Sequence, residues 1–183
     1  LGLTIDPALV AKMWDYALYA STPDGGSSGL HDANVWRPTN RNHLKEQRKQ
    51  YLRNCGLKGS EFNIEKQPCR FFPNAGHLFL RDSWRSNACY ASMDAVRYGG
   101  GHTHLSKLAV NLFSGKRMLL CDPGIFTYES SDPFMAYGKS TAAHNTVTIR
   151  NYNQAETNPD FLEIQILKNF TVFCGAYAGS YFS

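Results

Sequence analysis

The sequence lacks the features that mark disulfide-rich and membrane-spanning proteins. Its five cysteines are odd in number and none forms a CxxC pair, which argues against a disulfide framework and a thiolate zinc site. No run of 18 apolar residues is present, so no segment is expected to span a membrane. No signal peptide is recognised, since Leu1 leads directly into sequence of folded character.

Charge of one sign is also limited. The formal net charge is +4, and the only dense basic run extends from Lys45 to Arg53. This charge is compatible with a polyanionic partner but does not by itself indicate one. Nucleic acid is not expected, because no recognition motif accompanies the charge. Aromatic residues, in contrast, make up 13% of the chain, and they suit packing in β-sheets and contacts with sugar rings.

The first part of the chain is predicted to be helical. Asp6 and Pro7 are typical of a helix start. Apolar residues at helical spacing predict one buried face, formed by Leu9, Val10, Met13, Trp14, Ala17 and Leu18. A loop rich in helix breakers follows over residues 22–29.

A second helix is predicted over residues 41–54, with Gly56 as its stop. Its sparse apolar face consists of Leu44, Tyr51 and Leu52. We interpret the basic run inside this helix as a solvated face rather than a binding patch.

After Pro68 the pattern changes to short strand-like runs separated by turns. Ser114 and Gly115 are typical of a hairpin between two of these runs. The predicted strands cover residues 77–81, 88–93, 108–113, 117–121, 145–149, 162–166 and 170–174. These patterns predict a helical piece followed by an antiparallel sheet or sandwich.

One constellation of residues points to chemistry. His102 and His104 follow three glycines, and in a strand this spacing would place both imidazoles on one face of the sheet. The glycines would let a backbone or ligand approach closely. The alternative is a pair of partly exposed histidines with no special role.

Asp122 and His144 extend this constellation. Asp122 comes at the end of an apolar run before Pro123, where a buried carboxylate needs a cation or several donors. His144 is expected to head another strand. Two histidines and one aspartate would leave an open position on zinc. The alternative for Asp122 is the capping of a turn, and both interpretations stay open on the residues alone.

Four motifs, in order and spacing, resemble the heparinase II/III-like family of polysaccharide lyases. They are residues 74–84 (NAGHLFLRDSW), 101–105 (GHTHL), 115–124 (GKRMLLCDPG, with Tyr128 after it) and 140–147 (STAAHNTV). A looser likeness extends back to Asp24 and Asp32.

The resemblance implies a mainly β fold class: an antiparallel, supersandwich-like β-sandwich preceded by helices from the end of an (α/α) toroid. Residues 1–60 would belong to the toroid and residues 61–183 to a sandwich domain that is truncated. The family cleaves anionic polysaccharides by β-elimination at a uronic acid. The resemblance assigns a structural zinc to His104, Asp122 and His144, and places His102 against the substrate. It also implies a periplasmic or secreted location.

β-Elimination needs a group that neutralises the uronate carboxylate, a base for the C5 proton and an acid for the leaving oxygen. His102 suits the first or second task, and Tyr137 is a further catalytic candidate. Tyr128, Lys139 and Arg81 are weaker candidates for lining the cleft or pairing with an anionic sugar.

The sequence departs from the family's pattern at Ser106, where an acidic residue is common, with Lys107 after it. The family's other catalytic groups lie upstream of this chain, so the segment alone is expected to be inactive. A non-catalytic carbohydrate-binding β-sandwich that keeps the metal site is the alternative function. A cupin-like metal oxygenase fits less well, because the ligand order and the helical start do not favour it.

Overall fold

The computed structural model describes residues 5–33, 40–58, 63–159, 161–168 and 170–182. Its helices are α1 (Pro7–Ala20), α2 (Arg41–Asn54) and α3 (Pro133–Lys139), with 3-10 turns η2 (Ile64–Lys66) and η3 (Thr141–Ala143). Its strands are β1 (Arg70–Phe72), β2 (His77–Arg81), β3 (Tyr90–Asp94), β4 (Val110–Ser114), β5 (Arg117–Leu120), β6 (Asn153–Gln154), β7 (Phe161–Ile166), β8 (Thr171–Ala176) and β9 (Tyr181–Phe182). None of the helices in these ranges has the length and apolarity to cross a membrane.

Both predicted helices are confirmed, together with their starts. The Asp6 carboxylate accepts a hydrogen bond from the Ala8 amide at 2.9 Å, and Pro7 occupies the first turn of α1. The Asn40 side chain caps α2 in the same way through the His43 amide. These boundaries were predictable because capping depends on neighbours in the sequence.

The predicted buried face of α1 is wrong. Of the six residues expected there, only Leu18 is buried, whereas Leu9 and Met13 are 53% and 64% exposed. The buried residues are instead Ala11, Asp15, Leu18 and Tyr19. The helix is turned in this way because the Asp15 carboxylate binds two guanidinium groups, Arg48 at 2.5 Å and Arg70 at 2.7 Å. Arg48 is therefore a buried exception to the solvated basic face predicted for α2.

Five strands form an antiparallel sheet in the order β1-β2-β3-β4-β5. The hairpin predicted at Ser114 and Gly115 joins β4 to β5. Gly115 and Lys116 both have positive φ, 59° and 63°, as a tight hairpin turn requires.

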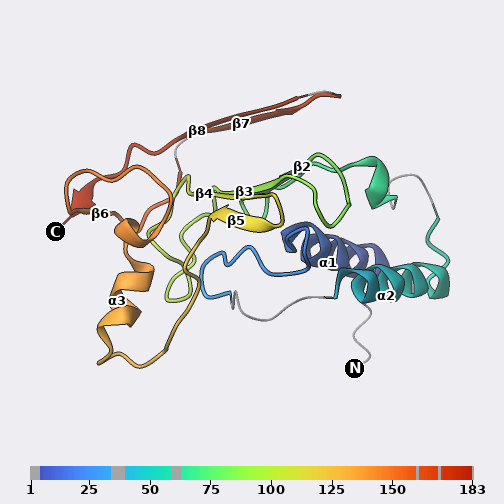
Figure 1. Ribbon diagram of the computed structural model, residues 1–183, viewed down its shortest axis with the longest axis horizontal. Coiled ribbons are helices and arrows are strands. Elements are labelled where there is room, and N and C mark those ends of the chain that lie inside the picture. Colours follow the sequence, from blue (N-terminus) through green and yellow to red (C-terminus); the bar gives the residue numbers. More distant parts are fainter. Residues whose placement is uncertain (1–4, 34–39, 59–62, 160, 169, 183) are drawn as a thin grey trace.

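The core lies between α1 and one face of this sheet (Figure 1). Tyr16 and Tyr19 of α1 meet the Phe72 ring edge-on at 5.3 and 5.6 Å, and Tyr16 also meets Phe79 at 5.6 Å. The buried members of this cluster are Leu18, Tyr19, Leu30, Ile64, Phe79, Tyr90 and Phe113. This packing joins the end of α1 and the loop after it to the sheet, so residues far apart in the sequence meet.

The sandwich is only partly represented in the described residues. The opposite face of the sheet carries Leu80, Ala91 and Leu112, and these line a groove of about 1150 Å³ together with Ile164 and Ile166 of β7. The β7–β8 hairpin thus lies over that face (Figure 1). The described residues form one five-stranded sheet and two two-stranded sheets, β6-β9 and β7-β8, and no closed sandwich.

The strand predicted over residues 145–149 is absent from the structure. Val147 and Ile149 are 70% and 49% exposed, and Ile149 forms only an isolated bridge with Tyr152. Near its start, the segment makes two bonds: the Asn145 carbonyl accepts the amide of Val110, the first residue of β4, and the Thr146 hydroxyl donates to the carbonyl of Lys107 in the loop before β4. The alternating pattern resembled a strand, but no neighbouring strand pairs with it.

Candidate metal and substrate site

His102 and His104 lie in the loop between β3 and β4. They are therefore not in a strand, the setting in which their spacing would place both imidazoles on one face of the sheet. The His102 side chain is 83% exposed, whereas that of His104 is fully buried. Gly100 has φ 90°, and no protein atom lies within 4 Å of where a Cβ would be at Gly100 or Gly101. These glycines therefore allow the turn rather than a close approach of backbone.

Asp32 joins the two histidines. Its Oδ2 lies 2.6 Å from Nδ1 of His102, and its Oδ1 lies 2.8 Å from Nε2 of His104. Burial alone would raise the pKa of Asp32, but the hydrogen bonds to both imidazoles and the charge of Lys139 lower it below its usual value. Asp32 is thus an ionised carboxylate at neutral pH. The looser family likeness extended to Asp32 without assigning it a role, and 70 residues separate it from His102.

The three predicted metal ligands lie together. His104, Asp122 and His144 are all buried, and each brings a ligand atom within 4.8 Å of the others. Asp122 Oδ2 lies 2.9 Å from Nδ1 of His144, while its Oδ1 accepts the Gly124 amide at 3.0 Å. The imidazole rings of His104 and His144 are 5.2 Å apart.

Two buried nitrogens of this group suit a cation. Nδ1 of His104 and Nε2 of His144 have no hydrogen-bond partner among the described residues. Each ring's other nitrogen contacts a carboxylate, Asp32 or Asp122. The Asp32 carboxylate behind the His104 ring is the arrangement that orients a histidine towards a metal, whereas Asp122, which contacts the His144 ring, is itself one of the three grouped residues. Burial lowers the pKa of His104, which favours the neutral form that binds metals.

The segments that carry these ligands differ from those predicted. Asp122 follows β5 by two residues, but His144 comes directly after η3 rather than at the start of a strand. The group was still found from sequence, because its residues stand in short motifs whose spacing does not depend on the type of segment.

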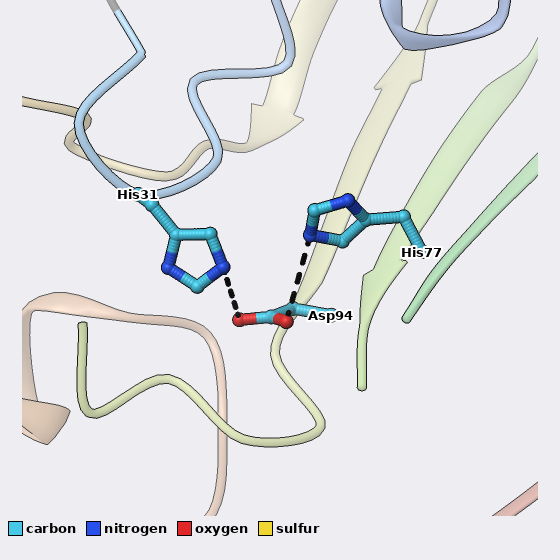
Figure 2. Close-up of side chains that lie close together, drawn as sticks. All are labelled: His31, His77 and Asp94. Carbon is cyan, nitrogen blue, oxygen red and sulfur yellow. Dashed lines mark ion pairs between the residues drawn. The ribbon is translucent and has the colours of Figure 1, made fainter. Parts of the chain in front are cut away.

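His31, His77 and Asp94 form a second histidine–aspartate group (Figure 2). Nε2 of His31 is 3.5 Å from Asp94 Oδ2, and Nε2 of His77 is 3.7 Å from Asp94 Oδ1. The ring of His31 meets that of His104 at 5.8 Å. Sequence analysis did not find this group, because its residues come from the loop after α1, from β2 and from β3.

Short hydrogen bonds stabilise the negative charge of Asp94. Ser106 donates to Oδ2 at 2.5 Å and the Val96 amide to Oδ1 at 2.9 Å. Burial acts to raise the pKa of Asp94, but the contacts with His31, His77 and Ser106 lower it well below its usual range. Ser106, where the sequence departs from the family, thus binds an aspartate. Lys107 beside it is buried, and burial lowers its pKa.

The remaining candidates are distributed as follows. The Tyr128 ring lies 6.3 Å from that of His102, whereas Tyr137, on α3, is 52% exposed and makes no described contact with His102. Lys139 bonds the Gly101 carbonyl. Arg81 is buried, donates to the carbonyls of Tyr19 and Ser21 and stacks on Trp84 at 4.1 Å. Arg81 therefore supports the fold rather than a sugar.

Comparisons with known proteins agree with this architecture. The solved structure of a heparinase III gene product is 18% identical with a TM-score of 0.78, covering 94% of this chain and 28% of its own. Heparan sulfate lyase HepC from Pedobacter heparinus is 22% identical with a TM-score of 0.73, covering 91% of this chain and 28% of its own. At these identities the likeness concerns the fold, and this chain spans little more than a quarter of each structure.

A comparison with curated protein sequences finds no match. The profile of the family described as "Heparinase II/III-like, C-terminal" matches residues 65–170, which is more than half of the chain. The chain therefore belongs to the heparinase II/III-like family and carries its C-terminal region.

Proposed function

We propose that this chain is the C-terminal part of a polysaccharide lyase that cleaves anionic, uronic-acid-containing polymers by β-elimination. The observation that carries the proposal is the Asp32 carboxylate, which bridges an exposed imidazole, His102, and a buried one, His104. Asp32 thereby connects His102, which is exposed to substrate, with His104, which is buried and suited to a metal.

The chemistry assigned to His102 follows from its hydrogen bond. Asp32 occupies Nδ1, so Nε2 is the atom left for substrate. As an imidazolium, His102 would donate to the uronate carboxylate, and as a neutral ring it would accept the C5 proton. Both uses need Nε2 of His102, and in both the Asp32 carboxylate holds the ring through Nδ1. Tyr137 stays a candidate catalytic residue whose contribution requires a substrate that reaches α3.

We further propose that zinc is held by His104, Asp122 and His144 in a structural role. Two unpartnered buried nitrogens and the Asp32 carboxylate behind the His104 ring support this assignment. When bound, zinc would fix the loop that carries His102 rather than take part in the elimination.

The domain assignment is also a proposal. Residues 1–60 would belong to a helical toroid, although a boundary near residue 60 lies outside the described residues. The exposed apolar side chains of Ile5, Leu9 and Met13 support a further helical partner for α1. The β7–β8 hairpin over the sheet supports a sandwich for residues 61–183. A periplasmic or secreted location would match a polymeric substrate.

Lyase activity is tested on the whole natural protein that contains this chain. The unsaturated uronate formed by β-elimination absorbs ultraviolet light, so a panel of uronate polymers can be followed directly. We expect absorbance to rise with at least one polymer. Silence on every polymer would contradict the enzyme, and binding without turnover would favour the non-catalytic carbohydrate-binding module.

Metal binding is tested by elemental analysis of the same protein. We expect about one zinc per chain in the wild type and its loss in His144→Ala, because one of the three ligands is removed. The matched control is His43→Ala, which removes an exposed histidine on α2 and should leave the zinc content unchanged. Equal zinc in His144→Ala and the wild type would show that the ligand assignment is wrong.

A further inference from the structure

His31 holds a backbone conformation that a histidine rarely adopts. Its φ is 55°, in the left-handed region, within a turn closed by a 3.1 Å hydrogen bond from the Ala33 amide to the Leu30 carbonyl. Glycine would adopt this conformation without strain. A side chain kept in a strained position at a candidate site suggests that the side chain is used there.

The His31 imidazole connects two buried groups. Its Nδ1 accepts the His104 amide at 3.1 Å, and its Nε2 faces Asp94 Oδ2 at 3.5 Å (Figure 2). His104 is fully buried, so its N–H needs a partner within the protein. His31 supplies this partner, and the next residue, Asp32, binds the imidazoles of His102 and His104.

The positions of the protons argue against a metal in the second group. Since Nδ1 of His31 is a hydrogen-bond acceptor, a neutral ring carries its proton on Nε2, the atom that faces Asp94. Tyr16 lies 2.7 Å from Nδ1 of His77, and burial raises the pKa of Tyr16 to about 12. The phenol therefore keeps its proton, and its contact with Nδ1 suits either tautomer of the His77 ring. The His31 nitrogen that faces Asp94 then lacks the lone pair that a metal ligand needs.

We propose that His31 is a positioning residue that ties the backbone of His104 to the buried carboxylate of Asp94. The chain of contacts runs from Asp94 through the His31 ring to the His104 amide. It fixes the backbone of the loop, while Asp32 fixes the two imidazoles that the loop carries. The inference rests on the proposed function, since it concerns the same metal and substrate site.

The test compares His31→Gly and His31→Asn in the whole protein. Glycine accepts the positive φ and removes the ring, so the protein should fold while the His104 amide loses its acceptor. We expect faster hydrogen exchange in peptides covering residues 99–108. The dissociation constant for zinc should rise about 10- to 100-fold, as found when groups behind metal ligands are removed. Asparagine tolerates left-handed backbone and offers an acceptor oxygen, so it should restore much of both.

Lys116→Gly is the matched control. Lys116 has a similar φ, 63°, in the exposed β4–β5 turn, so glycine relieves the same strain away from the site. It should leave exchange in residues 99–108 and zinc affinity unchanged.

Three outcomes would overturn the inference. The first is unchanged exchange in His31→Gly, and the second is faster exchange with unchanged zinc affinity. The third is a second zinc in the wild type that His31→Gly loses, since His31 would then be a ligand. If the wild type binds no zinc, the zinc proposal fails by itself, and kcat then replaces zinc affinity as the readout for His31.

Discussion

Replacing His102 with alanine in the whole protein should lower kcat by about 10²- to 10⁴-fold, the usual contribution of a group that transfers a proton or stabilises charge. Bound zinc should remain, because His102 is not among the three proposed ligands. The reason lies in the geometry: His102 is 83% exposed and held through Nδ1 by Asp32, so it can meet a substrate without supporting the core.

The measurement pairs steady-state kinetics with elemental analysis on the same samples. His43→Ala serves again as the matched histidine control and should behave as wild type in both. Loss of zinc together with activity would mean that His102 acts by holding the metal. Unchanged kcat would remove it from the catalytic groups.

Replacing Asp15 with alanine should lower the free energy of unfolding by about 3–5 kcal/mol, the typical cost of breaking a buried ion pair. The Asp15 side chain is 3% exposed and contacts Nε of Arg48 at 2.5 Å and Nη1 of Arg70 at 2.7 Å. Without it, the buried guanidinium of Arg48 keeps its charge but loses this carboxylate. The three residues join α1, α2 and β1, so the effect should extend across the interface between the helices and the sheet.

Urea denaturation measures this change through the midpoint and slope of the transition. Glu46→Ala is the matched control, because it removes the exposed ion pair with Lys49 on α2, and surface pairs contribute little. A loss for Asp15→Ala no larger than that for Glu46→Ala would show that the buried pair does not hold the helices to the sheet.

The elements of the fold were predictable wherever they depend on neighbours in the sequence. A capping residue and a proline marked the start of α1, Gly56 marked the end of α2, and apolar runs separated by turns marked β2, β3, β4, β5, β7 and β8. Residues 145–149 had the alternation of a strand, but the only backbone hydrogen bond that a described strand gives them comes from the Val110 amide at the start of β4, and no described strand pairs along them. Strand formation there required a pairing partner, and local pattern cannot provide one.

The orientation of α1 shows the same limit for a helix. Its sequence has an apolar stripe through Leu9 and Met13, yet the face that packs on the sheet contains Asp15. A buried carboxylate is acceptable there only because arginines from α2 and β1 meet it. Periodicity within one helix cannot anticipate charges contributed by other elements.

The sequence by itself determined the helices α1 and α2 but not α3, most strands, the family and the three residues proposed to bind zinc, because these depend on local patterns and motifs. Only the tertiary structure decided that Asp32 bridges His102 and His104, and that His31 links Asp94 to the same loop. Those partners lie 63 to 73 residues apart in the chain. They meet because α1 packs on the sheet and brings the loop after it against the loop between β3 and β4, and no pattern along the sequence records that contact.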